Sequence, residues 1–398
     1  MNFDKKNNIY RIIMVVVVTA LVTFLISSVI FYNYYLKTSN GNIQALSKYI
    51  NISDSTTTLE KKVEILKRYL ESEYMGDLNE EKMIQGALKG YVEGLGDKYT
   101  EYLTEDDLED LMVNVNGNYV GIGIYMSKNT EGDIIVLLPI EGSPAEEIGI
   151  EEGDIITKID GVECKGMELA DVANMVKGEE GTKVNLELKR EDKTINVEVV
   201  RRKVELKYID SKVLDDKIGY IQMISFEEGC ADKIKDEIKK LKEQNIDSII
   251  LDLRDNGGGL VTEAVSLSEI FVPMGKTILK SYDKDGKETV TKSTALSTEN
   301  IKLVILVNEG SASATEIFAA TMKDNNLATI VGTKTFGKGV MQEVQPLAIG
   351  GALKITIEEF KTPNGEKIHE VGIEPDIEVK NDGEEDSQLQ AAIDYLKK

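Results

Sequence analysis

Two short, almost wholly apolar segments constrain the fold of this chain more than any other feature. They are Ser-Ile-Ile-Leu-Asp-Leu at 248–253 and Leu-Val-Ile-Leu-Val at 303–307, and segments with helical spacing flank both. Near-continuous apolar strands that alternate with helices are typical of a sheet covered by helices on both faces. The sequence from residue 218 onward therefore predicts an α/β core.

Each of these strands runs into a polar loop that contains glycine. Arg254-Asp-Asn-Gly-Gly-Gly259 follows the first strand, and Asn308-Glu-Gly-Ser-Ala-Ser313 follows the second. Function in such sheets lies at the carboxyl ends of the strands, so we expect the two loops to converge on one site. Ser313 opens a predicted helix, where the amide of Ala314 could stabilise a developing oxyanion. Ser311 is the alternative nucleophile, and either hydroxyl could instead be only a helix N-cap.

The base for such a serine would be lysine rather than histidine. The chain contains a single histidine, His369, which lies in a polar segment and which we interpret as an ordinary surface residue. Lys338 lies between two glycines, and residues 334–342 contain no carboxylate; the nearest charge is Lys334. A lysine base must be neutral, and burial or a like charge lowers its pKa from about 10.4 toward neutrality.

Two further groups would complete the site. Glycines 257–259 offer backbone amides for an oxyanion hole, although they could also serve only as a flexible turn. Gln342 lies four residues after Lys338, and its amide could hold the lysine or a peptide. A phosphate-binding loop would look similar around Lys338, but no upstream Walker spacing supports a nucleotide site.

The composition argues against several other functions. The net charge of −23 disfavours nucleic-acid binding, which depends on neutralising phosphates. Two cysteines, Cys164 and Cys230, form no disulfide framework, and we expect both to be small buried side chains. With one histidine they also argue against a zinc site. We expect no metal, no cofactor and no nucleic-acid partner.

One segment predicts attachment to a membrane. Residues 12–32 are 21 residues without a charge, and a helix of that length spans a bilayer at about 1.5 Å per residue. Lys5, Lys6 and Arg11 precede the segment and only Lys37 closely follows it, which predicts a cytoplasmic N-terminus and an extracytoplasmic remainder. A cleaved signal peptide is the alternative, but no convincing small-residue cleavage site follows. We favour a retained single-pass anchor in the cell membrane.

Changes in the pattern divide the chain into regions. A polar stretch follows the anchor, helical spacing runs to Leu95, and short strands and turns occupy 116–202 before the α/β pattern begins. We expect a tail and anchor at 1–37, a linker at 38–58, a helical region at 59–112, a strand-rich domain at 113–203, the core at 204–380 and a C-terminal helix at 381–398.

The strand-rich domain resembles a PDZ domain. Gly142-Ser-Pro-Ala145, Gly153-Asp-Ile-Ile156 and Ile159-Asp-Gly161 stand where that family has them. A loop in such a domain can offer free amides to a peptide carboxylate while the adjacent strand edge pairs with the peptide. The alternative is that its glycines only permit a tight turn. The peptide-binding loop would consist of Gly121, Ile122, Gly123 and Ile124.

Three motifs together resemble the carboxy-terminal processing peptidases, the PDZ-containing serine endopeptidases of the S41 or tail-specific protease family. The motifs are Leu251-Asp-Leu-Arg-Asp-Asn-Gly-Gly-Gly-Leu260, Gly310-Ser-Ala-Ser-Ala-Thr-Glu-Ile317 and Thr335-Phe-Gly-Lys-Gly-Val-Met-Gln342. The likeness runs from about Leu59 to the end. It includes Gly94-Leu-Gly-Asp-Lys-Tyr-Thr100, Thr362-Pro-Asn-Gly365 and Gly372-Ile-Glu-Pro-Asp-Ile377.

The resemblance implies a role for each site residue. Ser313 would be the nucleophile, Lys338 the base and Gln342 the supporting partner of the lysine, with the amides of Gly259 and Ala314 forming the oxyanion hole. The choice of Ser313 over Ser311 rests on this resemblance.

Two positions depart from the family pattern. Asp97-Lys98 stands where many relatives have Asp-Pro, which should affect only a turn. Lys177 stands where relatives often carry an arginine that links the PDZ domain to the active site. A lysine there would make a weaker, non-bidentate contact.

The resemblance therefore implies a membrane-anchored, extracytoplasmic Ser/Lys endopeptidase. It would cleave near the C-termini of unfolded or flexible proteins, with apolar tails captured by the PDZ domain. A peptide-binding scaffold on an inactive hydrolase fold is one alternative, against which the intact Ser313, Lys338 and Gln342 argue. A hydrolase that uses His369 with a carboxylate is another. Helical terminal regions such as 386–398 could support a homo-oligomer or could cap one subunit.

Overall fold

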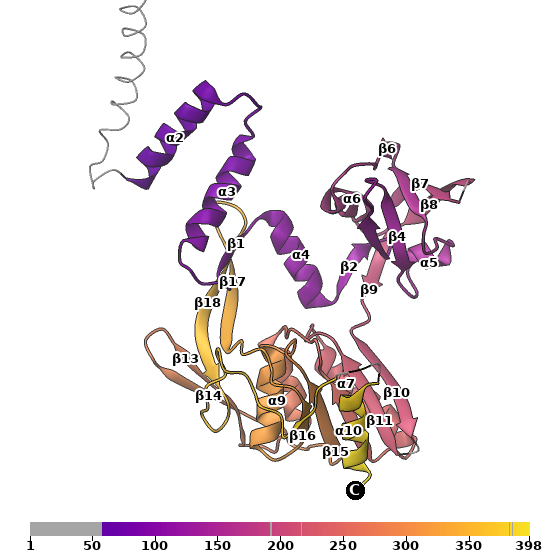
Figure 1. Ribbon diagram of the computed structural model, residues 1–398, viewed down its shortest axis with the longest axis vertical. Helices are drawn as coiled ribbons and strands as arrows, with labels where there is room; N and C mark the ends of the chain where they lie inside the picture. Colours follow the sequence, from indigo (N-terminus) through magenta and orange to yellow (C-terminus); the bar gives the residue numbers. More distant parts are fainter. Residues whose placement is uncertain (1–57, 192, 216, 382, 384) are drawn as a thin grey trace, which may run out of the picture. The chain divides into compact units, whose positions relative to one another are not determined.

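The computed structural model describes residues 58–191, 193–215, 217–381, 383 and 385–398 (Figure 1). The predicted anchor at 12–32 and nearly all of the predicted linker lie outside these residues. In the part of the chain that is described, no helix is long and apolar enough to cross a membrane. The chain divides into two compact units, one ending at Ile84 and one beginning at Gln85.

The described part of the first unit is helical, as the apolar spacing predicted. It contains α2 (Leu59–Glu73) and the beginning of α3 (Glu80–Glu93), and an ion pair joins Lys67 to Glu80. None of the residues of α2 is buried, and its Leu59 and Leu66 are exposed. Helix α2 therefore contributes no buried core. The predicted homo-oligomer stays a prediction.

The first part of the second unit is a small antiparallel domain. Its sheet has the order β3-β4-β5-β7-β8, with β6 paired to β5, while β2 and β9 pair with each other. Its core contains Ile122, Ile134, Ile156, Leu186 and Cys164. The elements are β2 (Asn118–Gly121), β3 (Ile124–Lys128), β4 (Ile134–Pro139), α5 (Pro144–Glu147), β5 (Ile155–Ile159), β6 (Val162–Glu163), α6 (Leu169–Val176), β7 (Lys183–Arg190), β8 (Lys193–Val200) and β9 (Arg202–Glu205).

The α/β core contains a mixed sheet with the order β10-β11-β12-β15-β16-β19. In this sheet β11, β12, β15, β16 and β19 run parallel. Strand β10 pairs with β11 as an antiparallel edge strand. Its elements are β10 (Ile209–Asp215), β11 (Ile218–Met223), α7 (Cys230–Glu243), β12 (Ser248–Asp252), α8 (Val261–Glu269), β15 (Lys302–Val307), α9 (Ala314–Asp324), β16 (Thr329–Gly332), β19 (Ile377–Glu378) and α10 (Ser387–Leu396).

Apolar side chains alternate between the two faces of this sheet, and helices cover both. Ile249 and Leu251 on β12 pack in one cluster with side chains of α7, α8 and α9. Ile250, between them, packs in a second cluster with Ala392 and Leu396 of α10. The predicted α/β core with two covered faces is therefore confirmed. Both Cys164 and Cys230 are free and buried, as expected.

A second, antiparallel sheet was not predicted from the sequence. It has the order β1-β18-β13-β14, and β17 pairs with β18 along most of its length, from Ala352 to Glu359 (Figure 1). The strands are β1 (Glu101–Leu103), β13 (Thr277–Asp283), β14 (Glu288–Lys292), β17 (Val340–Pro346) and β18 (Ala352–Lys361), and α4 (Glu105–Asn116) follows β1. This sheet brings segments from both ends of the second unit beside the loop that contains Lys338.

Candidate active site

The loops after β12 and β15 converge, as their positions in the parallel sheet predicted. The amide of Asp255 donates to Asn308 Oδ1 at 2.8 Å, and Asn308 Nδ2 donates to Asp255 Oδ1 at 2.9 Å. The amide of Ala312 donates to the carbonyl of Asn256 at 3.0 Å. These bonds fix the second loop against the first at the carboxyl edge of the sheet.

The two candidate serines have different environments. Ser311 is fully buried, and its hydroxyl donates to the carbonyl of Leu253 at 2.7 Å while it accepts from the amide of Asn308 at 3.0 Å. Ser313 is the N-cap of α9 and has φ 57° and ψ −116°, a region that non-glycine residues rarely occupy. The hydroxyl of Ser311 is thus committed to holding the loops together, and the backbone at Ser313 is strained.

Two glycines of the first loop are required by close packing. A Cβ atom on Gly258, where φ is 102°, would lie 2.8 Å from Ser313 Cβ and 2.9 Å from the amide nitrogen of Ala314. The amide of Gly258 itself donates to Asn256 Oδ1 at 2.9 Å. A Cβ on Gly259 would lie 2.3 Å from the carbonyl oxygen of Phe226. The glycine backbone therefore lies directly against Ser313, at a distance that no side chain would permit.

Lys338 is half-buried, and its ammonium lies 4.9 Å from the centroid of the Tyr99 ring. Burial lowers the pKa of Lys338 below its ordinary value, and the positive charge of Lys354 lowers it further. Lys334, the neighbour that the sequence pointed to, instead pairs with Glu374 at 2.7 Å. The like charge that lowers the pKa of Lys338 therefore comes from Lys354 and not from Lys334.

Sequence reasoning missed Glu316, which joins the serine and the lysine. This fully buried carboxylate accepts hydrogen bonds from the amide of Ser313 at 2.9 Å and from the amide of Lys338 at 2.8 Å. It also accepts from the amide of Gly337 at 2.7 Å and from Thr335 Oγ1 at 2.6 Å. The Ser-x-x-Glu spacing of a capping box, at 313–316, is the signal that could have found it.

Gln342 and His369 differ from expectation. Gln342 lies on β17 opposite Thr356 of β18, and its Nε2 donates to Thr356 Oγ1 at 3.4 Å. The interpretation of His369 as an ordinary surface residue is wrong, because it is half-buried and its Nδ1 is a buried atom without a hydrogen-bond partner. Its ring lies 6.3 Å from that of Tyr99, and its backbone approaches Gly339 so closely that no Cβ would fit there.

The candidate peptide-binding loop is held by the helix that follows it. Gly123 has φ 80°, and its carbonyl accepts from Ser143 Oγ at 3.0 Å. Ile122 and Ile124 are buried in the core of the small domain. Lys177, the regulatory candidate, forms a 2.8 Å ion pair with Asp110 of α4.

A short segment after β11 links the first loop to α4. The amide of Phe226 donates to the carbonyl of Gly258 at 2.9 Å, and the amide of Glu228 donates to the carbonyl of Val115 at 2.9 Å. Between them, the Glu227 carboxylate is buried, and neither oxygen has a hydrogen-bond partner. Burial raises the pKa of Glu227 above its ordinary value. Residues 226–228 thus touch the glycine loop on one side and the end of α4 on the other.

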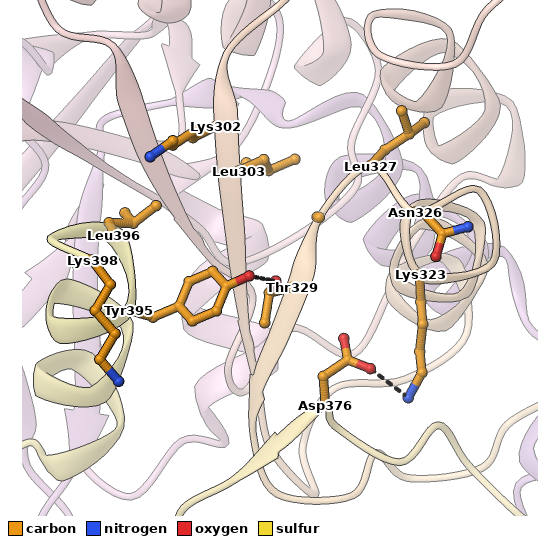
Figure 2. Close-up of a pocket in the computed structure, with 11 residues that line it drawn as sticks. Lys302, Leu303, Lys323, Asn326, Leu327, Thr329, Asp376, Tyr395, Leu396 and Lys398 are labelled. Carbon is orange, nitrogen blue, oxygen red and sulfur yellow. Dashed lines mark hydrogen bonds and ion pairs between the residues drawn. The ribbon is translucent and has the colours of Figure 1, made fainter.

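A separate pocket of about 610 Å³ lies at the opposite edge of the parallel sheet (Figure 2). Lys302 and Thr329, the first residues of β15 and β16, line it. Figure 2 shows two of its internal contacts, the 2.9 Å bond from Thr329 Oγ1 to the Tyr395 hydroxyl and the 3.1 Å ion pair of Lys323 with Asp376. None of the predicted catalytic residues lines this pocket, so it is not part of the candidate site.

Comparisons with known proteins identify the family of the α/β core and the fold of the small domain. Residues 217–379 match the model of peptidase family S41, and residues 135–190 match a PDZ domain. A probable CtpA-like serine protease of Staphylococcus aureus (strain MRSA252) is 38% identical over 340 residues, which cover 83% of this chain and 68% of that protein. The chain belongs to peptidase family S41.

Two further similarities extend the comparison. A probable CtpA-like serine protease of Staphylococcus haemolyticus (strain JCSC1435) is also 38% identical, over 80% of this chain. The chain spans only 64% of the length of that relative. The solved photosystem II D1 C-terminal processing protease is 28% identical, with a TM-score of 0.48 over 80% of this chain and 86% of that one.

Replacement of Glu316 in this S41 peptidase should lower its stability. In Glu316→Gln, the side-chain oxygen can accept from two donors, while its NH₂ group faces the other two and leaves them without an acceptor. We expect the free energy of unfolding to fall by about 1–3 kcal/mol, measured by urea denaturation.

Glu309→Gln is the matched control. Glu309 is an exposed residue of the loop that precedes α9, and it accepts a hydrogen bond from Thr333 Oγ1 at 3.0 Å, so its replacement should change the stability by less than about 0.5 kcal/mol. Equal effects of the two replacements would contradict the assignment of Glu316 as the group that joins the loops.

Proposed function

We propose that this S41 peptidase is a membrane-anchored, extracytoplasmic endopeptidase in which Ser313 is the nucleophile and Lys338 the base. The observation that carries the proposal is the Glu316 carboxylate, which binds the backbone amides of both residues. One buried group thereby orders the nucleophile and the base together. The lowered pKa of Lys338 supports the same roles, because only a neutral amine can accept the serine proton.

The reaction is acyl transfer in two steps. Ser313 Oγ attacks the carbonyl carbon of the scissile peptide bond, and its proton passes to Nζ of Lys338. The oxyanion would accept from the amide of Ala314, which is the first residue of α9, and from the amide of Gly259. Lys338 then donates the proton to the leaving amine. In the second step water hydrolyses the ester at Ser313, and Lys338 again acts as base and then as acid.

Gln342 would support Lys338 when substrate is bound. Its amide now donates to Thr356 Oγ1 over a long 3.4 Å. Catalytic hydrogen bonds are often long before substrate binds, and a weak bond of this kind costs little to exchange. We propose that the amide turns to the lysine in the acyl-transfer step.

The PDZ domain would select the substrate. In the described part of the domain, β3 is the terminal strand of its sheet, so one edge of β3 can pair with an extended peptide. The loop of residues 121–124 would receive the terminal carboxylate of that peptide. Proteins with flexible, apolar C-termini are therefore the proposed substrates, and cleavage near the tail follows from capture of the chain end.

The proposed location rests on residues 12–32. This uncharged run is long enough to span a bilayer, and the preceding Lys5, Lys6 and Arg11 favour a cytoplasmic N-terminus.

Replacement of the two proposed catalytic residues tests the chemistry. In full-length protein in detergent, Ser313→Ala or Lys338→Ala should lower kcat/KM for a disordered protein substrate at least about 1000-fold, because each removes a group that acts in the bond-making step. The measurement is the rate at which intact substrate disappears, followed by mass spectrometry.

His369→Ala and Ser311→Ala are the controls for the alternative base and the alternative nucleophile. His369→Ala should keep turnover well above that of Lys338→Ala. If His369→Ala abolished turnover and Lys338→Ala did not, the lysine base would be excluded. If activity survived in Ser313→Ala, the nucleophile would be a different residue.

Substrate tails test the PDZ assignment. Of two disordered substrates that differ only in the last three residues, Val-Ala-Ala or Asp-Asp-Asp, the apolar one should be cleaved at least about tenfold more efficiently. Amidation of the terminal carboxylate should produce a similar loss. Equal cleavage of all three would mean that the chain end is not recognised.

Protease accessibility tests the membrane topology. In cells whose wall has been removed and whose membrane is intact, externally added proteinase K should degrade the part from residue 38 onward. A tag placed before Lys5 should stay protected. Recovery of the protein in the soluble fraction after lysis would contradict a retained anchor.

A further inference from the structure

We infer that Tyr99 is a positioning residue for Lys338, whose aromatic ring closes one side of the lysine's surroundings and keeps water from the amine. The inference rests on the proposed role of Lys338 as the base. Tyr99 belongs to the segment Gly94-Leu-Gly-Asp-Lys-Tyr-Thr100, which lies far from the catalytic loops in sequence and to which the proposed function gives no role.

The contact between the ring and the lysine is direct. Nζ of Lys338 lies 4.9 Å from the centroid of the Tyr99 ring, within the distance of a cation–π contact. The ring of His369 meets the same tyrosine at 6.3 Å with an interplanar angle of 63°, and Nζ of Lys98 lies 5.1 Å from the Tyr99 centroid. Tyr99 thus contacts Lys338, His369 and Lys98 at once.

The backbone that carries Tyr99 is anchored to the sheet beside the site. The amide of Tyr99 donates to Asp97 Oδ1 at 3.1 Å, and Thr100 Oγ1 donates to Asp97 Oδ2 at 2.6 Å. The Thr100 hydroxyl also accepts from the amide of Thr356 on β18 at 3.0 Å. Thr356 is the residue to which Gln342 donates. The segment therefore holds the ring in a fixed position relative to β17 and β18.

The charges near Lys338 do not by themselves explain a neutral amine. Lys354 disfavours the ammonium, but it pairs with Glu101 at 2.7 Å, and Glu101, Asp97 and Glu316 all favour the charged form. Burial is the largest cause of the lowered pKa of Lys338. An apolar ring in contact with the amine supplies part of that burial. The ring also attracts the ammonium, which would raise the pKa of Lys338. We expect the effect of burial, which lowers that pKa, to be the larger of the two.

The pH profile of three variants tests the inference. The kcat/KM of an enzyme with a lysine base rises with pH through the pKa of that lysine. In Tyr99→Ala the amine loses this cover and water reaches it, so the acidic limb should move to higher pH. At pH 7 kcat/KM should then be at least about fivefold lower, and it should recover above pH 9. Tyr99→Phe keeps the ring and should leave the limb in place.

Thr100→Val is the third variant. It removes the hydroxyl that holds the segment to β18 without changing a charge, and it should shift the limb in the same direction as Tyr99→Ala. A general structural defect would instead lower kcat/KM equally at all pH values. A profile of Tyr99→Ala that does not move, or that moves to lower pH, would overturn the inference.

A second measurement keeps the inference separate from the proposed function. In the Ser313→Ala background, full-length protein is treated with cyanate, which carbamylates the neutral form of an amine, and labelling of Lys338 is followed against pH by mass spectrometry. The midpoint should be higher with Tyr99→Ala than with Tyr99→Phe. If wild type cleaves no substrate but the midpoint moves as expected, the proposed function fails and the role of Tyr99 stands. If wild type is active and the midpoint does not move, the role of Tyr99 fails alone.

Discussion

The geometry of the site depends on one buried anion. The carboxylate of Glu316 is removed from water, and four donors from two separate loops replace its hydration. A buried carboxylate without such donors would be strongly destabilising. Movement of either loop away from Glu316 would remove some of these donors, so both loops are held in place together. The strained backbone of Ser313 is tolerated for the same reason, since the surrounding bonds leave it no alternative position. The helix start and the lysine loop therefore behave as one unit.

The glycine loop on the other side of Ser313 belongs to a second set of contacts. Phe226 bonds to Gly258 and to Leu260, while Glu228 bonds to Val115 at the end of α4. Gly117, which ends α4, would clash with Glu227 if it carried a side chain. Strand β2 of the small domain begins directly after this glycine. The segment 226–228 thus provides a short, continuous physical connection between the base of the PDZ domain and the backbone beside Ser313.

Much of this arrangement could be predicted because it depends on local pattern. The apolar strands at 248–253 and 303–307 predicted a sheet covered by helices on both faces, and the rule that function lies at the carboxyl ends of such strands predicted that the two loops converge. The pairing of Tyr99 with Lys338 joins positions that no local pattern connects. It depends on the antiparallel sheet of β1, β17 and β18, whose strand pairing is a tertiary property. The environment of His369 was misjudged for the same reason, since polarity along the chain does not report what packs over a residue.

The loop of Lys338 is completed by a later segment of the chain. Thr335 Oγ1 accepts from the amide of Ile373 at 2.7 Å, and the carbonyl of Gly337 accepts from the amide of Glu370 at 2.8 Å. The bonds that hold the lysine loop are therefore complete only when residues 370–373 have been synthesised and folded. A nascent chain that ends before residue 370 lacks two of the hydrogen bonds that hold the loop of Lys338. The order of synthesis alone would then make the complete lysine loop one of the last parts of the α/β core to form.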